Sequence, residues 1–526
     1  MTSPAPTDRP LHMRTLTVST RGVVPIVSLA LASVLAAVAC SGDGGGDNGG
    51  GTAGAPGGAA GAGRGVAGSS GNANPGGSAG RDGNGSSGAS AGSAGMFGSG
   101  GVSGGSTGGA SPGGGTAGSA GGAPGGSAGS SAGMASTGGV PAVIANAIYA
   151  APNGTANAGG TLENPTTLAS AVSKVGAGGT VYLRGGKYGL TTTVSLSKNG
   201  TDKSRIQLRA YPLDAERPLL DFSAEGSGSR GLNVSGSYWH FYGIDVANAG
   251  DNCMYVSGSN NTVEFMSFSE CEDSGLQLGG GAANNLVLNC DSYFNADASQ
   301  GNADGFAAKL DVGSGNKFVG CRAWNNSDDG WDGYLRGADN VSTSYEDCWA
   351  FDNGKLKNGS LGSGDGNGFK TGGSDDKALR HNATYLRCIS AGNVHDGFDH
   401  NSNRGSVAIR NCAAHDNGNN INFSTTNIAA SLTIKNSISL GTNGSLSATT
   451  TDITNNSWQN GLSATNADFV SVEHGLLESK RKSDGSLPDI DYLKLAPGSD
   501  LHDAGIDLGL PYHGSAPDLG PFESAP

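Results

Sequence analysis

Short segments in which apolar and polar residues alternate recur through the C-terminal half of the chain, with little helical periodicity between them. Related stretches such as "CRAWNNSDDG", "CWAFDNG" and "CAAHDNG" open these units. Eight aligned units start at residues 244, 266, 290, 321, 348, 388, 412 and 437, so successive starts lie 22, 24, 31, 27, 40, 24 and 25 residues apart. A period in the low twenties built from short strands predicts the coils of a parallel β-helix. A leucine-rich repeat is the competing solenoid, but its leucine spacing and helices are missing.

Two positions of the repeat carry the same residue type in coil after coil. The cysteines that open five units are Cys290, Cys321, Cys348, Cys388 and Cys412, and the asparagines five positions later are Asn295, Asn326, Asn353, Asn393 and Asn417. Stacked asparagines can hydrogen-bond from one coil to the next. Stacked cysteines lie about 4.8 Å apart with parallel side chains, which is a poor approach for a disulfide, so we expect a ladder of buried thiols.

The folded part begins near residue 141. Leu168, Val172 and Val175 fall on one face of a short helix that follows the turn residues Asn164 and Pro165, and "TVYLRGG" then reads as a strand. A helix that covers the first edge of a sheet stack is the cap expected of a repeat protein. The sequence therefore predicts an all-β fold, a single right-handed parallel β-helix over residues 141–526 with a short N-terminal capping helix.

Residues 41–140 are rich in glycine, serine and alanine, as in "GGSAGRDGNGSSGASAGSAG", and hold many of the 94 glycines of the chain. Such a stretch buries too little surface to offset the entropy of ordering, so we expect a disordered linker. The formal net charge of −14 argues against a nucleic-acid partner, which would need a basic face.

Residues 1–40 have the pattern of an export signal, with Arg14 and Arg21 before the apolar run Val23–Ala39 and small residues before Cys40. The ending "AVAC" resembles a bacterial lipobox, which implies cleavage before Cys40 and lipidation of its thiol. We therefore expect an exported protein, an outer-surface lipoprotein or otherwise a secreted one. Simple secretion and an uncleaved anchor remain alternatives.

The stretch "NNSDDGWDGY", residues 325–334, places Asp328, Asp329 and Asp332 within five positions around Trp331. Neighbouring like charges repel, and a large ring wants burial, so this crowding predicts a bound cation. The two longest intervals of the repeat, 31 and 40 residues, flank the stretch. Loops inserted on adjoining coils commonly build a site.

Four coils share the pattern polar residue, glycine, aromatic ring and variable position, in "DGFA", "DGWD", "NGFK" and "DGFD". If the rings stack inward, strand alternation turns the next residues outward into one solvent-facing column. The inward rings are Phe306, Trp331, Phe369 and Phe398; the outward column is Ala307, Asp332, Lys370 and Asp399; a second column is Asp304, Asp329, Asn367 and Asp396.

An aspartate before glycine is by itself a common turn former, and a lone lysine is usually a surface group. Several acids beside one amine in consecutive coils indicate a site. Oxygen-only ligands favour a hard cation, and Ca²⁺ accepts irregular sets of oxygens more readily than Mg²⁺, so we expect calcium.

These motifs resemble polysaccharide lyase family 9, the calcium-dependent pectate lyases with a right-handed parallel β-helix. The resemblance rests on "NADGFAAKL", "GNKFVGCRAWNNSDDGWD", "GDGNGFKTGG" and "DGFDHNSN", and it covers roughly residues 147–525. It implies that Asp304, Asp328, Asp329 and Asp332 bind calcium and that Lys370 is the Brønsted base. The implied activity is β-elimination on polygalacturonate, an acidic polysaccharide, by a protein expected to be monomeric.

Two other classes of function stay open at this point. A glycoside hydrolase on the same β-helix would use acids to activate water and would not need Lys370, and its "GHG" and "RxK" signatures are missing. A noncatalytic surface or carbohydrate-binding module would use calcium only to clamp loops. If Lys370 is not the base, the alternatives on neighbouring loops are Lys309, Arg336 and Lys355.

Overall fold

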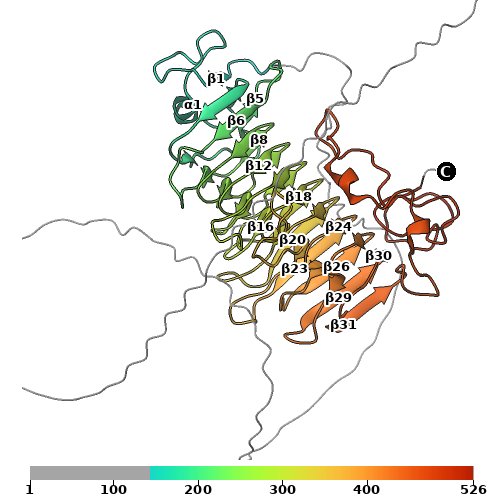
Figure 1. Ribbon diagram of the computed structural model, residues 1–526. Helices are drawn as coiled ribbons and strands as arrows, with labels where there is room; N and C mark the ends of the chain where they lie inside the picture. The colour runs from blue at the N-terminus through green and yellow to red at the C-terminus, as the bar shows by residue number, and fades with distance from the viewer. Residues whose placement is uncertain (1–142, 525–526) are drawn as a thin grey trace, which may run out of the picture. The chain divides into compact units, whose positions relative to one another are not determined.

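The computed structural model describes residues 143–524, most of which form a stack of parallel β-coils (Figure 1). Strands from successive coils pair side by side in three parallel sheets of 12, nine and 10 strands. The export signal, Cys40 and the linker predicted for residues 1–140 lie outside the described residues. Within residues 143–524, no helix is long and apolar enough to cross a bilayer.

The 12-stranded sheet consists of β1 (Ile148–Ala150), β2 (Thr180–Leu183), β5 (Ile206–Ala210), β8 (Trp239–Tyr242), β11 (Thr262–Glu264), β14 (Leu286–Leu288), β17 (Asn316–Val319), β20 (Val341–Glu346), β23 (His381–Leu386), β26 (Ser406–Arg410), β29 (Ala429–Lys435) and β31 (Ala448–Thr454). The 10-stranded sheet consists of β3 (Gly186–Gly189), β6 (Pro218–Asp221), β9 (Asp245–Ala247), β12 (Ser267–Ser269), β15 (Asp291–Tyr293), β18 (Arg322–Trp324), β21 (Trp349–Phe351), β24 (Ile389–Ala391), β27 (Ala413–His415) and β30 (Ile438–Leu440).

The nine-stranded sheet carries the candidate site. It consists of β4 (Val194–Leu196), β7 (Leu232–Val234), β10 (Met254–Val256), β13 (Leu276–Leu278), β16 (Phe306–Ala308), β19 (Trp331–Asp332), β22 (Phe369–Lys370), β25 (Asp396–Asp399) and β28 (Asn419–Asn422). Through most of the stack a coil runs from the 12-stranded sheet to the 10-stranded sheet and then to this one, as β17, β18 and β19 do.

The predicted aromatic ladder is confirmed. Phe306, Trp331, Phe369 and Phe398 pair in register between neighbouring strands, and all four side chains are buried. Successive ring centroids lie 5.0, 4.9 and 5.0 Å apart with nearly parallel planes. The stacked rings hold these strands in one register, because a slip of one residue would turn every ring out of the core.

The asparagine ladder is confirmed as well. From Asn295 to Asn417, each amide Nδ2 donates to the Oδ1 of the next ladder asparagine at 2.8–2.9 Å. Each buried hydrogen bond of this kind contributes about 1 kcal/mol, and a broken one would leave buried polar atoms unsatisfied. The ladder fixes the turns between the 10-stranded and nine-stranded sheets, which is where the loops around the site begin.

The predicted thiol ladder is present: all five cysteines at the shared repeat position are buried and free. The two other described cysteines, Cys253 and Cys271, form a disulfide, which the sequence did not predict. They lie outside the shared position, since Cys253 precedes β10 and Cys271 follows β12.

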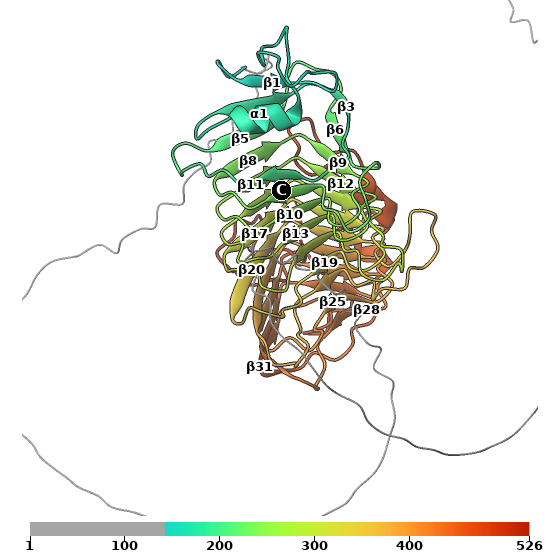
Figure 2. The same ribbon diagram turned by 90° about the vertical axis from the view of Figure 1, so that its left-hand side faces the viewer.

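The capping helix is α1 (Leu168–Lys174), seen at the first edge of the stack in Figure 2. The Thr167 side chain caps its N-terminus by accepting the Ser170 N–H at 3.2 Å. Leu168 and Val172 are buried against the core, together with Val175 at the C-cap. The predicted apolar face of this helix is therefore confirmed.

Residues 455–524 follow the last strand and pack along the 10-stranded sheet, which is visible as the red segment beside β18 and β24 in Figure 1. This segment has two short 3-10 helices, η1 (Asn466–Asp468) and η2 (His474–Glu478). The Arg481 guanidinium reaches the Asp291 carboxylate at 2.7 Å, and Arg322 binds the same carboxylate at 2.8 Å. A buried ion network thus ties the end of the chain to the stack.

Two inserted loops meet at the turn between the 10-stranded and nine-stranded sheets. Residues 294–305 join β15 to β16, and residues 352–368 join β21 to β22. The Ser363 N–H donates to the Gln300 carbonyl at 2.6 Å and links the two loops directly. These are the two long intervals of the repeat, and their contact places both beside the acidic coil between them.

Candidate active site

The outward column is in the predicted register: Ala307, Asp332, Lys370 and Asp399 pair between neighbouring strands. It is not solvent-facing as predicted, because Asp332 and Lys370 are only 7% and 8% exposed. The inserted loop 352–368 closes over this part of the column, and its Asp365 carboxylate lies 3.1 Å from Lys370 Nζ. The charged groups are thus held away from bulk water.

Three of the predicted acidic residues come together. Carboxylate oxygens of Asp304, Asp328 and Asp329 all lie within 4.8 Å of one another, and all three side chains are buried. Asp304 stands two residues before Phe306, and Asp329 stands two residues before Trp331, so the register of the aromatic ladder superposes them on adjacent coils. Asp328 joins them as the preceding residue of the same turn.

Backbone and amide groups fix these carboxylates. The Asp329 N–H donates to Asp304 Oδ1 at 3.3 Å, and the Asp365 N–H donates to Asp328 Oδ1 at 2.6 Å. Asp329 Oδ1 accepts both the backbone N–H and the side-chain amide of Asn367, at 2.8 and 2.9 Å. The acids are therefore preorganised by their neighbours on the coils and the inserted loop.

Asp332, the fourth predicted ligand, does not belong to this close set. Its Oδ1 accepts the Tyr334 N–H at 2.9 Å, and its Oδ2 lies 3.5 Å from Lys309 Nζ. Lys309 in turn donates to Asp304 Oδ2 at 2.7 Å, so one ammonium joins Asp332 to the three clustered acids.

Lys370 lies at the centre of the negative charge. Its Nζ is 3.0 Å from Asp329 Oδ2 and 3.1 Å from Asp365 Oδ2. The second buried amine is Lys309, which the sequence offered only as an alternative base. A signal for its place existed in "DGFAAKL", where it follows strand β16 directly and stands five residues after Asp304.

Burial of like charges shifts the acids in one direction. Burial raises the pKa of Asp304 to about 6 against the opposing charge of Lys309, and it raises the pKa of Asp328 to about 7 against that of Lys370. Burial and the Asp328 charge raise the pKa of Asp329 well above its usual range. The cluster therefore resists full ionisation on its own.

The pKa of Lys370 is raised as well, which favours its charged form, whereas the raised pKa values of the three acids favour their neutral forms. Burial acts to lower the pKa of Lys370, but the carboxylates of Asp329, Asp332, Asp328 and Asp365 raise it well above the usual lysine value. For Asp332, burial acts to raise the pKa, but Lys370 and Lys309 outweigh it and hold that pKa below its usual range. Without a further cation, Lys370 stays protonated and cannot accept a proton.

The next coil also carries two aspartates, Asp396 and Asp399, but Asp396 is held by asparagine amides. The Asp396 carboxylate accepts the side-chain amides of Asn419 and Asn422 at 2.8 and 2.7 Å, which fixes it as a structural group. Burial and the Asp396 charge raise the pKa of Asp399 to about 7. The strongest electrostatic influences on Lys370 come from Asp329, Asp332, Asp328 and Asp365 and not from Asp399.

The cluster fits a divalent cation. Asp329 Oδ2 is buried and has no hydrogen-bond donor; Lys370 Nζ lies 3.0 Å away but outside hydrogen-bonding geometry. A buried carboxylate oxygen that accepts no hydrogen bond is costly, and a cation shared with Asp304 and Asp328 would satisfy it. A donor set made only of carboxylate oxygens suits a hard ion such as Ca²⁺.

The chain matches the family model described as "Pel9A-like, right handed beta helix region" over residues 148–443. It is 38% identical over 391 residues to pectate lyase L of Dickeya dadantii (strain 3937), covering 71% of this chain and 90% of the relative. It is 40% identical over 391 residues to pectate lyase L of Paenibacillus polymyxa (strain SC2), covering 69% and 84%. The crystal structure of pectate lyase Pel9A superposes with a TM-score of 0.66 at 36% identity, covering 72% of this chain and 96% of that one. The predicted right-handed parallel β-helix is confirmed.

The shifted acids predict how stability depends on pH. With pKa values of about 6 for Asp304 and about 7 for Asp328, against about 3.9 in an unfolded chain, these two carboxyl groups bind more protons in the metal-free folded protein than in the unfolded chain. Their contribution to the stability of the protein therefore falls as pH rises from about 4 to about 7. We expect the melting temperature in chelator to fall across this window, with a smaller fall in Asp328→Asn. Thermal unfolding followed by circular dichroism measures both, and equal slopes for the two proteins would contradict the assignment.

Proposed function

Because the chain belongs to the Pel9A-like right-handed β-helix family and is a pectate lyase-like polysaccharide lyase, we propose that it cleaves polygalacturonate by calcium-assisted β-elimination with Lys370 as the base. The observation that carries this proposal is the 3.0 Å approach of Lys370 Nζ to Asp329 Oδ2. The amine and the candidate cation site share one carboxylate, so a sugar held at the cation is within reach of the amine.

Asp304, Asp328 and Asp329 would hold the calcium ion, and the resemblance to family 9 adds Asp332 as a fourth ligand. Bound calcium would supply the positive charge that the C6 carboxylate of a galacturonate needs when its C5 proton is removed. The three carboxylates, once their charge is shared with a cation, hold the Lys370 proton less strongly. Lys370 then becomes able to act as a neutral amine.

The step itself moves one proton and two electron pairs. The Lys370 amine takes the C5 proton, the C5–H electrons form the C4–C5 double bond, and the C4–O4 bonding electrons leave with the O4 oxygen, which takes up a proton to become a hydroxyl group. The products are a new chain end and a 4,5-unsaturated uronate. Asp332 and Lys370 directly follow the stacked rings of Trp331 and Phe369. The stacking fixes the register of the two strands and so the position of both charged groups, which preserves the geometry that proton transfer needs.

Substituting Lys370 tests the base. In calcium, Lys370→Ala should lower turnover on polygalacturonate at least about a hundredfold while the protein stays folded and still binds calcium, because the proton acceptor is lost and the carboxylate ligands are kept. Lys370→Arg should be nearly as damaging, since a guanidinium stays protonated. Wild-type activity should climb toward alkaline pH as the amine loses its proton. The ultraviolet absorbance of the unsaturated product measures the rate, because a hydrolase or a noncatalytic module would create no conjugated double bond.

Lys355 provides a matched control, because it is an ion-paired lysine on the same inserted loop, 2.6 Å from Asp352. Lys355→Ala should keep wild-type rates. If Lys370→Ala retains wild-type turnover instead, Lys370 is not the base, and the search moves to Lys309, Arg336 and Lys355.

We also propose that the protein is exported and anchored by lipid at Cys40, with residues 41–140 as a tether that holds the enzyme away from the membrane. The apolar run Val23–Ala39 and the small residues before Cys40 support this. Metabolic labelling with a fatty acid should mark the wild-type chain and not a Cys40→Ser variant. Equal labelling, or none in either chain, would contradict lipidation.

A further inference from the structure

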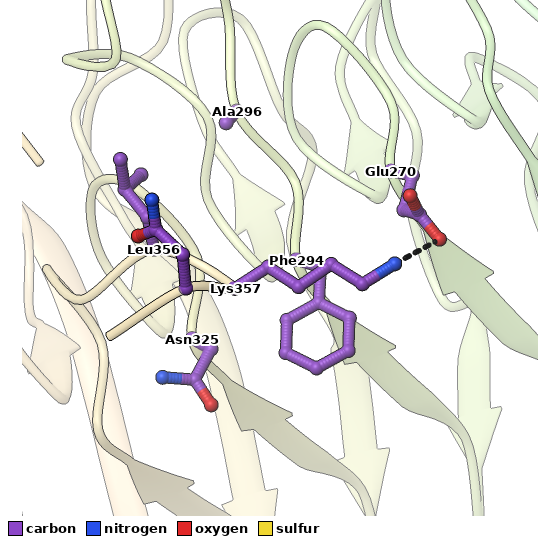
Figure 3. A pocket seen from close by; sticks show the side chains of 7 residues that line it. Glu270, Phe294, Ala296, Asn325, Leu356 and Lys357 are labelled. Atoms are coloured by element: carbon purple, nitrogen blue, oxygen red, sulfur yellow. Dashed lines mark hydrogen bonds and ion pairs between the residues drawn. The ribbon is translucent and has the colours of Figure 1, made fainter. Parts of the chain in front are cut away.

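A surface pocket of about 420 Å³ lies between turns that follow strands of the 10-stranded sheet and the inserted loop 352–368 (Figure 3). Its floor comes from turns of three successive coils: Glu270 follows β12, Phe294 follows β15 and Asn325 follows β18. Its wall is a small hairpin in the inserted loop, from which Leu356 and Lys357 face the pocket. The volume falls within the range of small-molecule sites.

Phe294 occupies an unusual backbone position. In the coils around the pocket, the residue that directly follows the strand of the 10-stranded sheet has a left-handed backbone conformation. After β12, β18 and β21 this residue is Glu270, Asn325 and Asp352, with φ values of 57°, 50° and 53°. Phe294 has φ 60°, which costs a bulky L-residue about 1 kcal/mol or more. Asparagine and aspartate tolerate this conformation far better. The left-handed backbone conformation at this position therefore disfavours a phenylalanine, so Phe294 is not there for the sake of the backbone.

The other phenylalanine with this backbone conformation, Phe265, is covered by the chain itself. Gly485 of the C-terminal segment packs onto its ring, and the Arg217 guanidinium lies 4.6 Å from its centroid. Both rings are partly buried, but Phe294 meets only Tyr293 edge-on at 5.1 Å among the aromatic side chains, and the exposed side chain of Lys357 reaches over it. A ring covered by one exposed lysine side chain can be uncovered for a ligand.

Lys357 supplies a charge that a ligand can compete for. Its Nζ lies 2.9 Å from Glu270 Oε1 and 5.3 Å from the Phe294 centroid. The Lys357 and Glu270 side chains are 58% and 46% exposed, and an ion pair of this kind contributes less than about 1 kcal/mol. Another carboxylate can therefore replace Glu270 at small cost, while the C–H face of a sugar ring lies on Phe294.

The pocket wall and the candidate active site belong to one connected structure. The hairpin closes through the Lys355–Leu361 bridge, and the Gly362 N–H donates to the Gly354 carbonyl at 2.8 Å. Three residues further on, Asp365 holds Asp328 with its N–H and faces Lys370 with its carboxylate. Asn325 is also only three residues before Asp328, a span of at most about 10 Å. One polymer chain can therefore reach both places.

We propose that this pocket binds a uronate residue of the polymer outside the cleavage site, with its carboxylate on Lys357 and its ring on Phe294. This rests on the proposed function only in taking an acidic polysaccharide as the substrate. A polymer held at this second point is retained between cleavages, whereas a short oligosaccharide that fills only the cleavage site gains nothing from the pocket.

Two variants and a control test the pocket. Phe294→Asn restores the residue type that suits the backbone, so it should keep or raise the melting temperature while removing the stacking face. Lys357→Ala removes the charge. Lys317→Ala is the control, since Lys317 is an exposed lysine in a similar pair with Glu346, at 2.6 Å on the 12-stranded sheet.

Calorimetric titration of a saturated oligogalacturonate in chelator isolates the pocket from calcium-dependent binding. We expect wild type and Lys317→Ala to bind the oligogalacturonate with similar affinity. Phe294→Asn and Lys357→Ala should each bind it at least about fivefold more weakly, which corresponds to a loss of about 1 kcal/mol of binding free energy. With calcium, KM for polygalacturonate should rise about fivefold in both pocket variants, with kcat and the KM for trigalacturonate unchanged.

Unchanged oligogalacturonate binding in both pocket variants would overturn the pocket and leave the lyase function standing. The same titration with the methyl ester of the oligogalacturonate tests the charge. If the wild-type protein binds the ester as tightly as it binds the free acid, the carboxylate contact with Lys357 is overturned. Weaker binding in Phe294→Asn alone, together with a lower melting temperature, would show that the ring only packs and would also overturn the proposal. Binding that follows the expected pattern in a protein that forms no unsaturated product would support the pocket and refute the lyase mechanism.

Discussion

The burial of like charges is the constraint on which the site depends. Asp304, Asp328 and Asp329 share a space in which their oxygens lie within 4.8 Å, and the surrounding chain leaves them almost no water. The protein offsets this only in part, with Lys309 at one side and Lys370 at the other. A group of charges in this balance binds either protons or a cation, and the choice between them decides whether Lys370 can act as a base.

The β-helix can hold these acids close together because its coils repeat at a fixed spacing. Residues two positions before the stacked rings of Phe306 and Trp331 must lie above one another, and those residues are Asp304 and Asp329. The asparagine ladder fixes the turns that lead into the same strands. The scaffold thus holds the acids where their repulsion alone would separate them, which is the preorganisation that electrostatic catalysis requires.

Much of this arrangement was predictable, because a repeat converts sequence position into spatial position. The rings, the asparagines, the five thiols and the pairing of Asp332 with Lys370 all follow from the alignment of coils. Features set by contacts with segments outside the repeat were not predictable: the cover over Lys370 by Asp365 and the docking of Arg481 on Asp291. The inserted loop and the C-terminal segment carry no repeat, so nothing in their spacing shows which coil they contact.

Calcium titration by calorimetry, in two buffers of different ionisation enthalpy at about pH 6.5, tests the central claim most directly. Since Asp304 and Asp328 have pKa values of about 6 and about 7 without a cation, calcium must displace protons from the cluster. The observed heat should therefore depend on the buffer at this pH and much less at about pH 8.5, and Asp329→Asn should lose most of the affinity. Binding heat that is the same in both buffers at about pH 6.5, or no binding at all, would contradict the account.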